Sequence, residues 1–313
     1  MKNHPRISEL LVETGAYRDL DEPVILASGQ LGIFYVNTEK LCQDGGEFNR
    51  YGNDSWAMIE HALKMTDEHP TFNEVIDILT GRVRAEMIDS EGFSNRATTL
   101  ISGGQRRDWL FSGPVAKKLN LSHLSLYKGG KTELISFLEG NPVEIMGAVE
   151  DLDNYDSFHL SDLLTEGSSA YRNNNGVEAG WIPWQRKKGI NINNLATVVT
   201  RLQGGEENLK GRGVQTHAFV AIDEDFLREY SGNAEVAIDY TKDPTAWSTS
   251  YLQENGALAL VGSFDPEGGK LDKARKFIDR YGSVLRESGK LPELEGEVER
   301  KYSVTLGELV EKE

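Results

Sequence analysis

The stretch that decides the fold of this chain is Phe158-His-Leu-Ser-Asp-Leu-Leu-Thr-Glu-Gly-Ser-Ser169. Its apolar residues predict a strand that ends near Asp162, followed by a tight turn of small and hydroxyl residues and then a helix. Free main-chain N–H groups at such a turn and helix start can bind a phosphate, and Asp162 can accept hydrogen bonds from sugar hydroxyls. A strand end followed by an ordinary Ser/Thr helix cap explains the same residues, so the stretch alone leaves both interpretations open.

The stretch lies in a region of alternating strands and helices that extends from about residue 97 to residue 222. The expected strands are 97–104, 122–127, 143–149, 158–164, 195–200 and 214–222, and the expected helices are 105–119 and 206–210. This alternation predicts an α/β fold with a central, mostly parallel sheet flanked by helices. Ligands bind beyond the carboxyl ends of the strands in such sheets. The polar candidates of this chain, at 103–107, 128–131, 162–169 and 201, all follow predicted strands.

Two pairs of cationic residues are candidates for an anion site. Arg106 and Arg107 follow a strand and two glycines, where guanidinium groups can hold an anion; a solvated surface pair explains them equally well. Lys128 and Lys131 flank two glycines in a segment that suits a mobile cationic loop, although such residues usually form a solvated turn.

The composition narrows the classes of partner. The net charge of −16 over 313 residues argues against non-specific nucleic-acid binding, which needs clustered Lys and Arg. The single cysteine, Cys42, excludes an internal disulfide framework and a cysteine-based metal site. No apolar run has the length of a membrane span and no signal-peptide core follows the first residues, so we expect a cytoplasmic protein with no nucleic acid or membrane partner.

The flanking regions complete the expected architecture. Before the alternating region we expect a helix at 5–16, two short strands within 24–37 joined at Ser28-Gly29, and helices at 53–68 and 71–89. After residue 223 we expect a strand at 256–261 and helices at 270–286 and 305–312. The predicted division is an N-terminal hood that binds a base (1–50), an α/β core (51–228) and a C-terminal helical extension (229–313).

Three segments resemble those of a known family, the type I phosphoribosyltransferases. Ser161-Asp-Leu-Leu-Thr-Glu-Gly-Ser-Ser169 is similar to the family signature of two acidic residues, two apolar residues, Thr, a variable residue, Gly and a hydroxyl residue. Leu26-Ala-Ser-Gly-Gln-Leu-Gly-Ile-Phe-Tyr-Val-Asn37 and Thr197-Val-Val-Thr-Arg-Leu-Gln-Gly-Gly-Glu-Glu-Asn-Leu209 are similar to segments of the orotate branch. The resemblance covers about residues 5–228.

The resemblance implies an activity and a site. The chain would transfer the 5-phosphoribosyl group from phosphoribosyl pyrophosphate (PRPP) to orotate, as a homodimer with Mg²⁺ bound through PRPP or at Asp162. The 5′-phosphate would be held by the turn residues Thr165, Glu166, Gly167, Ser168 and Ser169, and the ribose by Asp162. The pyrophosphate would be held by four cations, Lys128, Lys131, Arg106 and Arg107. The base would be held by Arg201, Phe34 and Tyr35. Lys128, Lys131 and Asp162 would be catalytic. Without the resemblance, Phe34 and Tyr35 are better explained as core residues than as a wall for a ring.

The chain departs from the family pattern at three positions. Ser161 replaces the first acidic residue of the signature, Ala27 replaces a lysine, and the mobile-loop histidine is absent from Tyr127-Lys-Gly-Gly-Lys-Thr-Glu133. Two further hypotheses therefore stand beside orotate transfer. One is a phosphoribosyltransferase for another base, and the other is a non-catalytic protein that senses PRPP or a nucleotide.

Overall fold

The chain folds into two compact units. The computed structural model describes residues 3–26, 28–89, 96–138, 144–148, 152–268 and 271–311. The first unit consists of residues 1–16 and 37–226, and the second of residues 17–36 and 227–313. This division differs from the predicted one, because residues 17–36 of the expected hood belong with the C-terminal extension.

The first unit is built on a sheet that has seven strands among the described residues, in the order β11-β10-β7-β3-β4-β5-β6. Strands β11, β10, β7, β3 and β4 are parallel to one another, whereas β5 is antiparallel to both β4 and β6. The predicted α/β class with a mostly parallel sheet is therefore confirmed. The strands are β3 (Thr99–Gly104), β4 (Ser122–Leu126), β5 (Thr132–Ser136), β6 (Glu144–Ala148), β7 (Asp156–Leu164), β10 (Asn191–Thr200) and β11 (Gln215–Ala221).

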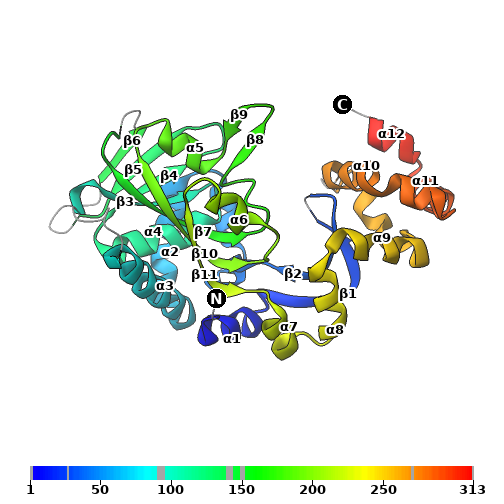
Figure 1. Cartoon of the computed structure of the whole chain (residues 1–313), viewed down its shortest axis with the longest axis horizontal. Helices are drawn as coiled ribbons and strands as arrows, with labels where there is room; N and C mark the ends of the chain where they lie inside the picture. Colours follow the sequence, from blue (N-terminus) through cyan, green and yellow to red (C-terminus); the bar gives the residue numbers. More distant parts are fainter. Residues whose placement is uncertain are drawn as a thin grey trace. The chain divides into compact units, whose positions relative to one another are not determined.

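Helices flank this sheet (Figure 1). Helix α4 packs against β3, β4 and β7, while α2 and α3 pack against α4, and α5 and α6 contact β10 and β11 respectively. All the residues of β3 are buried, as expected for a strand covered on both faces. The helices and 3-10 helices of this unit are α1 (Pro5–Glu13), η1 (Thr38–Cys42), η2 (Glu47–Tyr51), α2 (Ser55–Glu68), α3 (Pro70–Asp89), η3 (Arg96–Thr98), α4 (Asp108–Leu119), α5 (Trp181–Arg186) and α6 (Gly205–Lys210).

The segment after the 158–169 stretch was predicted to be helical, and that prediction is wrong. Strands β8 (Arg172–Asn174) and β9 (Val177–Ala179) form an antiparallel hairpin there. Its two turn residues, Asn175 and Gly176, have φ values of 52° and 88°. Asn-Gly readily adopts this left-handed conformation in two-residue hairpin turns. The 165–169 turn therefore leads into a hairpin and not into a helix.

The lysine segment at 128–131 is a tight turn between β4 and β5. The Tyr127 N–H donates to the Lys131 carbonyl oxygen at 2.9 Å, and the Gly130 N–H donates to the Tyr127 carbonyl oxygen at 3.0 Å. Gly129 has a φ of 97°, which glycine adopts without steric cost. The segment predicted as a mobile loop is thus a short hairpin connection, and β5 is a strand that the sequence analysis did not predict.

The second unit combines an N-terminal hairpin with the C-terminal helices. Strands β1 (Tyr17–Ile25) and β2 (Leu31–Val36) are antiparallel. The C-terminal elements are α7 (Glu224–Tyr230), which contains the boundary between the units, α8 (Ala234–Lys242), α9 (Pro244–Asn255), η4 (Leu258–Phe264), α10 (Leu271–Glu287), α11 (Leu291–Tyr302) and α12 (Leu306–Glu311). The predicted strand at 256–261 is wrong, because a 3-10 helix spans most of that apolar run.

The tip of the hairpin is bound to the C-terminal helices by one glutamine. Gln30 is 7% exposed, and its amide donates to the Pro244 carbonyl oxygen at 2.6 Å and to Ser248 Oγ at 3.0 Å. Its amide oxygen accepts a hydrogen bond of 2.6 Å from Arg280 Nη1. Ile25 of the hairpin is buried in the same apolar cluster as residues of η4, α10, α11 and α12. The two sequence segments therefore share one core.

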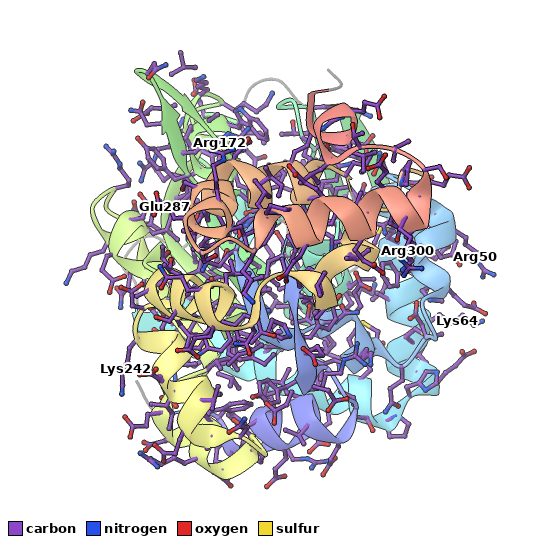
Figure 2. The ribbon with its side chains drawn as sticks, turned by 90° about the vertical axis from the view of Figure 1, so that its right-hand side faces the viewer. Arg50, Lys64, Arg172, Lys242, Glu287 and Arg300 are labelled. Carbon is purple, nitrogen blue, oxygen red and sulfur yellow. The ribbon has the colours of Figure 1, made fainter. Side chains whose placement is uncertain are left out.

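Charged side chains lie on the surface of both units. Arg50, Lys64, Arg172, Lys242, Glu287 and Arg300 all extend away from the ribbon in Figure 2 and are exposed. Among the described residues, no helix has the length and apolar character needed to cross a membrane.

Candidate functional site

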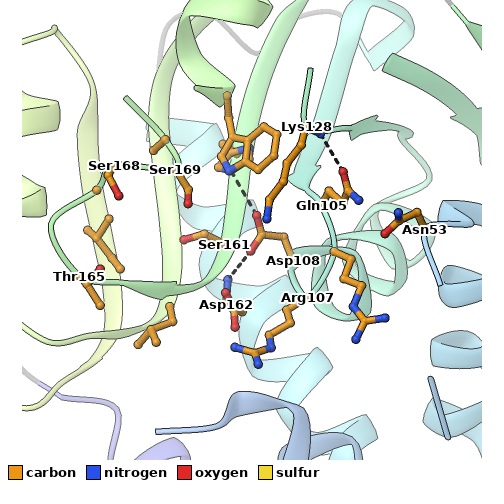
Figure 3. Close-up of a pocket in the computed structure, with 17 residues that line it drawn as sticks. Asn53, Gln105, Arg107, Asp108, Lys128, Ser161, Asp162, Thr165, Ser168 and Ser169 are labelled. Atoms are coloured by element: carbon orange, nitrogen blue, oxygen red, sulfur yellow. Dashed lines mark hydrogen bonds and ion pairs between the residues drawn. The ribbon is translucent and has the colours of Figure 1, made fainter. Parts of the chain in front are cut away.

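A pocket of about 410 Å³ opens in the first unit where β3, β4 and β7 end (Figure 3). Eight of the predicted site residues line it: Arg106, Arg107, Lys128, Asp162, Thr165, Gly167, Ser168 and Ser169. The sequence analysis missed several other lining residues, among them Asn53, Gln105, Asp108, His159 and Trp181. The carboxyl ends of the strands thus gather most of the predicted residues in one place, as expected for an open α/β sheet.

The turn from Thr165 to Ser169 has main-chain N–H groups that are not used within the described protein. None of the described residues accepts a hydrogen bond from the main-chain N–H groups of residues 166–169. Ser168 and Ser169 are exposed, so their hydroxyls are also accessible. Successive free N–H groups in a turn form an anion-binding concavity even without a helix behind them. The turn therefore has the donors that the sequence predicted, although their geometry comes from the turn alone.

Two glycines let this turn lie directly against the start of α6. Gly167 has a φ of 75°, in the left-handed region that side chains disfavour. The Gly205 N–H donates to the Thr165 carbonyl oxygen at 3.0 Å. A Cβ atom on Gly205 would lie 2.5 Å from that same oxygen, so this contact requires glycine. The segment after β10 thus supports the turn, a role that the sequence analysis did not assign to it.

Asp162 lines the pocket, and hydrogen bonds hold both its side chain and its main chain. Its Oδ2 accepts a hydrogen bond of 2.7 Å from Thr38 Oγ1, and its main-chain N–H donates to Asp108 Oδ1 at 2.9 Å. The side chain is half-buried and lines the pocket. The predicted sugar-binding carboxylate is therefore accessible from the pocket and fixed by its neighbours.

Asp108, the first residue of α4, places a second carboxylate in the pocket. The residue is 7% exposed. Its Oδ2 accepts a hydrogen bond of 2.8 Å from the Gly104 N–H, while its Oδ1 accepts from Asp162. Burial raises the pKa of this carboxyl well above its ordinary value, the charge of Asp162 raises it further, and the two main-chain donors oppose the change. In the sequence, Asp108 follows directly after the two arginines of a predicted strand-to-helix turn, which was its one local signal.

A buried polar network lies behind Asp108. Ser157 Oγ donates to Ser102 Oγ at 2.8 Å, and Ser102 Oγ lies 2.9 Å from His159 Nδ1. Ser102 therefore links Ser157 to His159 within this network. His159 Nε2 lies 3.7 Å from Asp108 Oδ2, and burial lowers the pKa of His159 to about 3. The histidine is therefore neutral at physiological pH.

The three cations of the pocket differ in their partners. The Arg107 guanidinium forms an ion pair with Glu39. The Arg106 guanidinium donates to Asn49 and to the Gly52 carbonyl oxygen and lies over the Phe48 ring. Among the described residues, none forms a hydrogen bond or ion pair with the Lys128 ammonium group, whose side chain extends into the pocket in Figure 3. Lys128 is therefore the cation most available to a ligand.

Three predicted first-unit residues do not line the pocket. The Lys131 ammonium group pairs with Glu133 at 2.8 Å and lies over the Tyr127 ring. Glu166 has an exposed side chain, and the buried Arg201 donates its main-chain N–H to the Leu164 carbonyl oxygen at 2.9 Å. The structure thus places Lys128 in the pocket but not Lys131, although the same role was predicted for both.

The two aromatic candidates for base binding belong to the second unit. Phe34 is 1% exposed, and its ring packs 5.7 Å from the Tyr17 ring and 5.8 Å from the Tyr240 ring. Tyr35 is half-buried, with the Arg18 guanidinium 5.6 Å from its ring centroid. Phe34 therefore has the core environment that the sequence analysis left open beside base binding. Ala27 lies outside the described residues.

The carboxylates of the pocket determine which kind of metal site it can form. No group of three or more His, Cys, Asp or Glu residues gathers as a metal site in the described parts of the chain. Mg²⁺ commonly binds through one or two carboxylates together with substrate phosphates and water. The half-buried Asp162 carboxylate fits that kind of site, in which the substrate supplies most of the ligands.

The chain is similar to several known phosphoribosyltransferases. No protein-family model matches the chain. An adenine phosphoribosyltransferase of Pectobacterium carotovorum is 24% identical over 180 residues, which cover 52% of this chain and 91% of that protein. The orotate phosphoribosyltransferase of Aeropyrum pernix has a TM-score of 0.45 at 15% identity, over 71% of this chain and 98% of that structure. The Mycobacterium tuberculosis orotate phosphoribosyltransferase in complex with 5-phospho-α-D-ribosyl 1-diphosphate has a TM-score of 0.40 at 16% identity, over 70% of this chain and 97% of that structure.

Proposed function

We propose, from the resemblance of this chain to the type I phosphoribosyltransferases, that it transfers the 5-phosphoribosyl group of PRPP to a nucleobase and releases pyrophosphate. One observation carries the proposal: free main-chain donors, an accessible carboxylate and cations line a single pocket at the carboxyl ends of the strands. A phosphate, a sugar and a pyrophosphate require those three kinds of group in that order. The curated relative is itself a phosphoribosyltransferase, which supports the same reaction class.

The roles of the residues follow from their groups. The N–H groups and hydroxyls of the 165–169 turn would hold the 5′-phosphate, and Asp162 would accept hydrogen bonds from the ribose. Lys128 would stabilise the negative charge that develops on the departing pyrophosphate. Arg106 and Arg107 line the same pocket and would contribute after exchanging their present partners. Mg²⁺, bound through PRPP and Asp162, would neutralise charge on the pyrophosphate.

The buried surroundings of the site supply positioning more than proton transfer. In this reaction the leaving group departs while positive charge develops on the sugar carbon, so orientation of the two substrates and charge stabilisation provide most of the rate. His159 is neutral and fully buried, and Asp108 accepts hydrogen bonds from two strands. These residues would keep the pocket in shape while the ligand binds.

For the base we propose orotate first, on the resemblance of residues 26–37 and 197–209 to the orotate branch. Adenine is the second candidate, since the curated relative is an adenine phosphoribosyltransferase. The proposal includes a homodimer, as the resemblance implies. A PRPP sensor without turnover remains the competing class, favoured by the position of Lys131, which pairs with Glu133 outside the pocket.

A pyrophosphate-release assay tests the proposal. Purified protein is mixed with PRPP and Mg²⁺, and orotate, uracil, adenine, guanine and hypoxanthine are added in turn. We expect base-dependent pyrophosphate release that is fastest with orotate and is lost when EDTA removes Mg²⁺. Release with adenine alone would move the assignment to the adenine class. Calorimetric binding of PRPP without release for any base would contradict the enzyme and support the sensor.

A further inference from the structure

The carboxyl ends of β3 and β7 are not paired with each other, unlike the earlier residues of these two strands. Their pairing extends from Thr99 opposite Asp156 to Ser102 opposite His159 and no further. Gly104 and Asp162 lie beyond the last pair, and Asp162 lines the pocket. Main-chain N–H groups that leave a ladder in a buried region must find another acceptor.

One side chain accepts from both strands at that point. Asp108 Oδ2 accepts from the Gly104 N–H at 2.8 Å, and Asp108 Oδ1 accepts from the Asp162 N–H at 2.9 Å. Each oxygen of the carboxylate thus serves one strand. A carboxylate suits this bridge because it has two equivalent acceptors, whereas an amide has one acceptor and one donor.

The bridge is held rigidly from behind. Ser112 Oγ donates to the Asp108 main-chain carbonyl oxygen at 2.8 Å and fixes the first turn of α4. Asp108 Oδ2 also faces His159 Nε2 at 3.7 Å. Ser112 and His159 are both 0% exposed, so the carboxylate has little freedom to rotate away.

We propose that Asp108 is a positioning residue for the ribose-binding carboxylate: it joins the ends of β3 and β7 and so holds Asp162 in the orientation that binds the sugar of PRPP. This inference rests on the proposed function. It assigns to Asp108 an effect that acts through Asp162, since both Asp108 oxygens are already engaged by main-chain donors. Because Ser161 replaces the first acidic residue of the family signature, Asp162 is the one carboxylate at the two acidic positions of that signature, and its orientation matters more.

A double-mutant cycle distinguishes positioning from a general structural role. Asp108→Asn retains the size of the side chain but removes one acceptor, so one strand loses its bridge. Asp162→Ala removes the carboxylate that is being positioned and retains the main-chain N–H. PRPP affinity is measured by calorimetry in the presence of Mg²⁺ for the wild type, each single variant and the double variant. Thr80→Ala is the matched control, because the Thr80 hydroxyl is buried and, among the described residues, bonds only the Ile76 carbonyl oxygen of its own helix, at 2.7 Å.

We expect Asp108→Asn to weaken PRPP binding about tenfold in the wild-type background, which is the upper range for the loss of one hydrogen bond. In the Asp162→Ala background the same substitution should change the affinity less than about twofold, because coupled residues are non-additive. Thr80→Ala should bind PRPP as the wild type does. Asp108→Asn should also raise KM for PRPP more than it lowers kcat.

Two outcomes overturn the inference, and each is distinct from failure of the proposed function. Equal losses from Asp108→Asn in both backgrounds would show a general structural role. Rapid amide hydrogen exchange at Asp162 in the folded wild type would show that the bridge does not form, and this measurement needs no variant to fold. If the wild type binds PRPP but transfers it to no base, the proposed enzyme fails while the cycle still reports on Asp108. If the wild type binds no PRPP, both proposals fail.

Discussion

Replacing Lys128 by alanine should weaken PRPP binding strongly, whereas the same change at Lys131 should not. The two lysines lie at either end of one four-residue turn and were given the same role from the sequence. The structure places Lys128 in the pocket, and among the described residues nothing pairs with its ammonium group. Lys131 pairs with Glu133, and its side chain is 58% exposed.

The size of the effect follows from these partners. A ligand phosphate would gain its contact with Lys128 without breaking an existing ion pair, so the loss on truncation should be about 1.5 to 3 kcal/mol, or roughly 10- to 100-fold in affinity. Truncating Lys131 removes an exposed ion pair, which contributes about 0 to 1 kcal/mol to stability and nothing to the pocket. We therefore expect Lys131→Ala to change PRPP affinity less than about twofold.

Calorimetric titration of PRPP with Mg²⁺ at two salt concentrations measures both variants. The Lys128→Ala variant should show a smaller salt dependence than the wild type, because an exposed charge pair has been removed from the complex. Thermal denaturation of each variant serves as the check on folding. Equal losses for the two lysines, or no loss for Lys128→Ala, would refute the assignment of Lys128 as the available cation.

Three other predictions concern the turn, the buried histidines and the second unit. Gly205→Ala forces a Cβ within 2.5 Å of the Thr165 carbonyl oxygen, so we expect about 1–3 kcal/mol of destabilisation and loss of PRPP binding. Gly211→Ala is the control in the same denaturation and binding measurements, because the nearest atoms to its Cβ would be carbonyl oxygens at 3.5 Å, an ordinary contact distance. Burial lowers the pKa of His123 and of His159 from 6.5 to about 3. Between pH 6.5 and pH 3 these histidines bind a proton in the unfolded chain but not in the folded one. The free energy of unfolding should therefore fall with falling pH, by on the order of 1.4 kcal/mol per pH unit for each histidine. Urea denaturation from pH 7 to pH 4 measures this, and an unfolding free energy that does not change with pH would contradict their burial. Gln30→Ala should destabilise the second unit by about 1–3 kcal/mol, seen as faster proteolysis of the C-terminal helices, and unchanged proteolysis would contradict the anchoring role.

The central sheet could be predicted because its signals are local. An almost continuous apolar run such as 195–200 indicates a strand covered on both faces, and the candidates at strand ends follow from the alternation of strands and helices. The apolar run at 256–261 gave the wrong result, because a short apolar segment has no periodicity that separates a strand from a buried helical turn. The hairpin at 172–179 was missed even though Asn175-Gly176 is a strong turn signal, since a helix was predicted to follow the turn at 165–169.

The site was predictable only where its chemistry is contiguous. The turn at 165–169 contains its own donors, so the sequence reveals it. Asp108 owes its role to two N–H groups, at Gly104 and Asp162, that are far apart in the chain and meet only because β3 and β7 are neighbours in the sheet. No local sequence pattern predicts such a tertiary contact. The contacts of Arg106 and Arg107 with residues 39–52 could not be predicted for the same reason.

The composition of the second unit from two distant segments has a consequence for biosynthesis. Residues 17–36 leave the ribosome early, but the helices that bury Ile25 and accept hydrogen bonds from the Gln30 amide belong to residues 227–313. Domains generally fold as units during synthesis, starting from the N-terminus. Here the apolar side of the hairpin stays exposed while residues 37–226 are translated, because the helices that cover it are made last. Nascent chains stalled before residue 227 should therefore present this hairpin to chaperones even when the first unit has already folded.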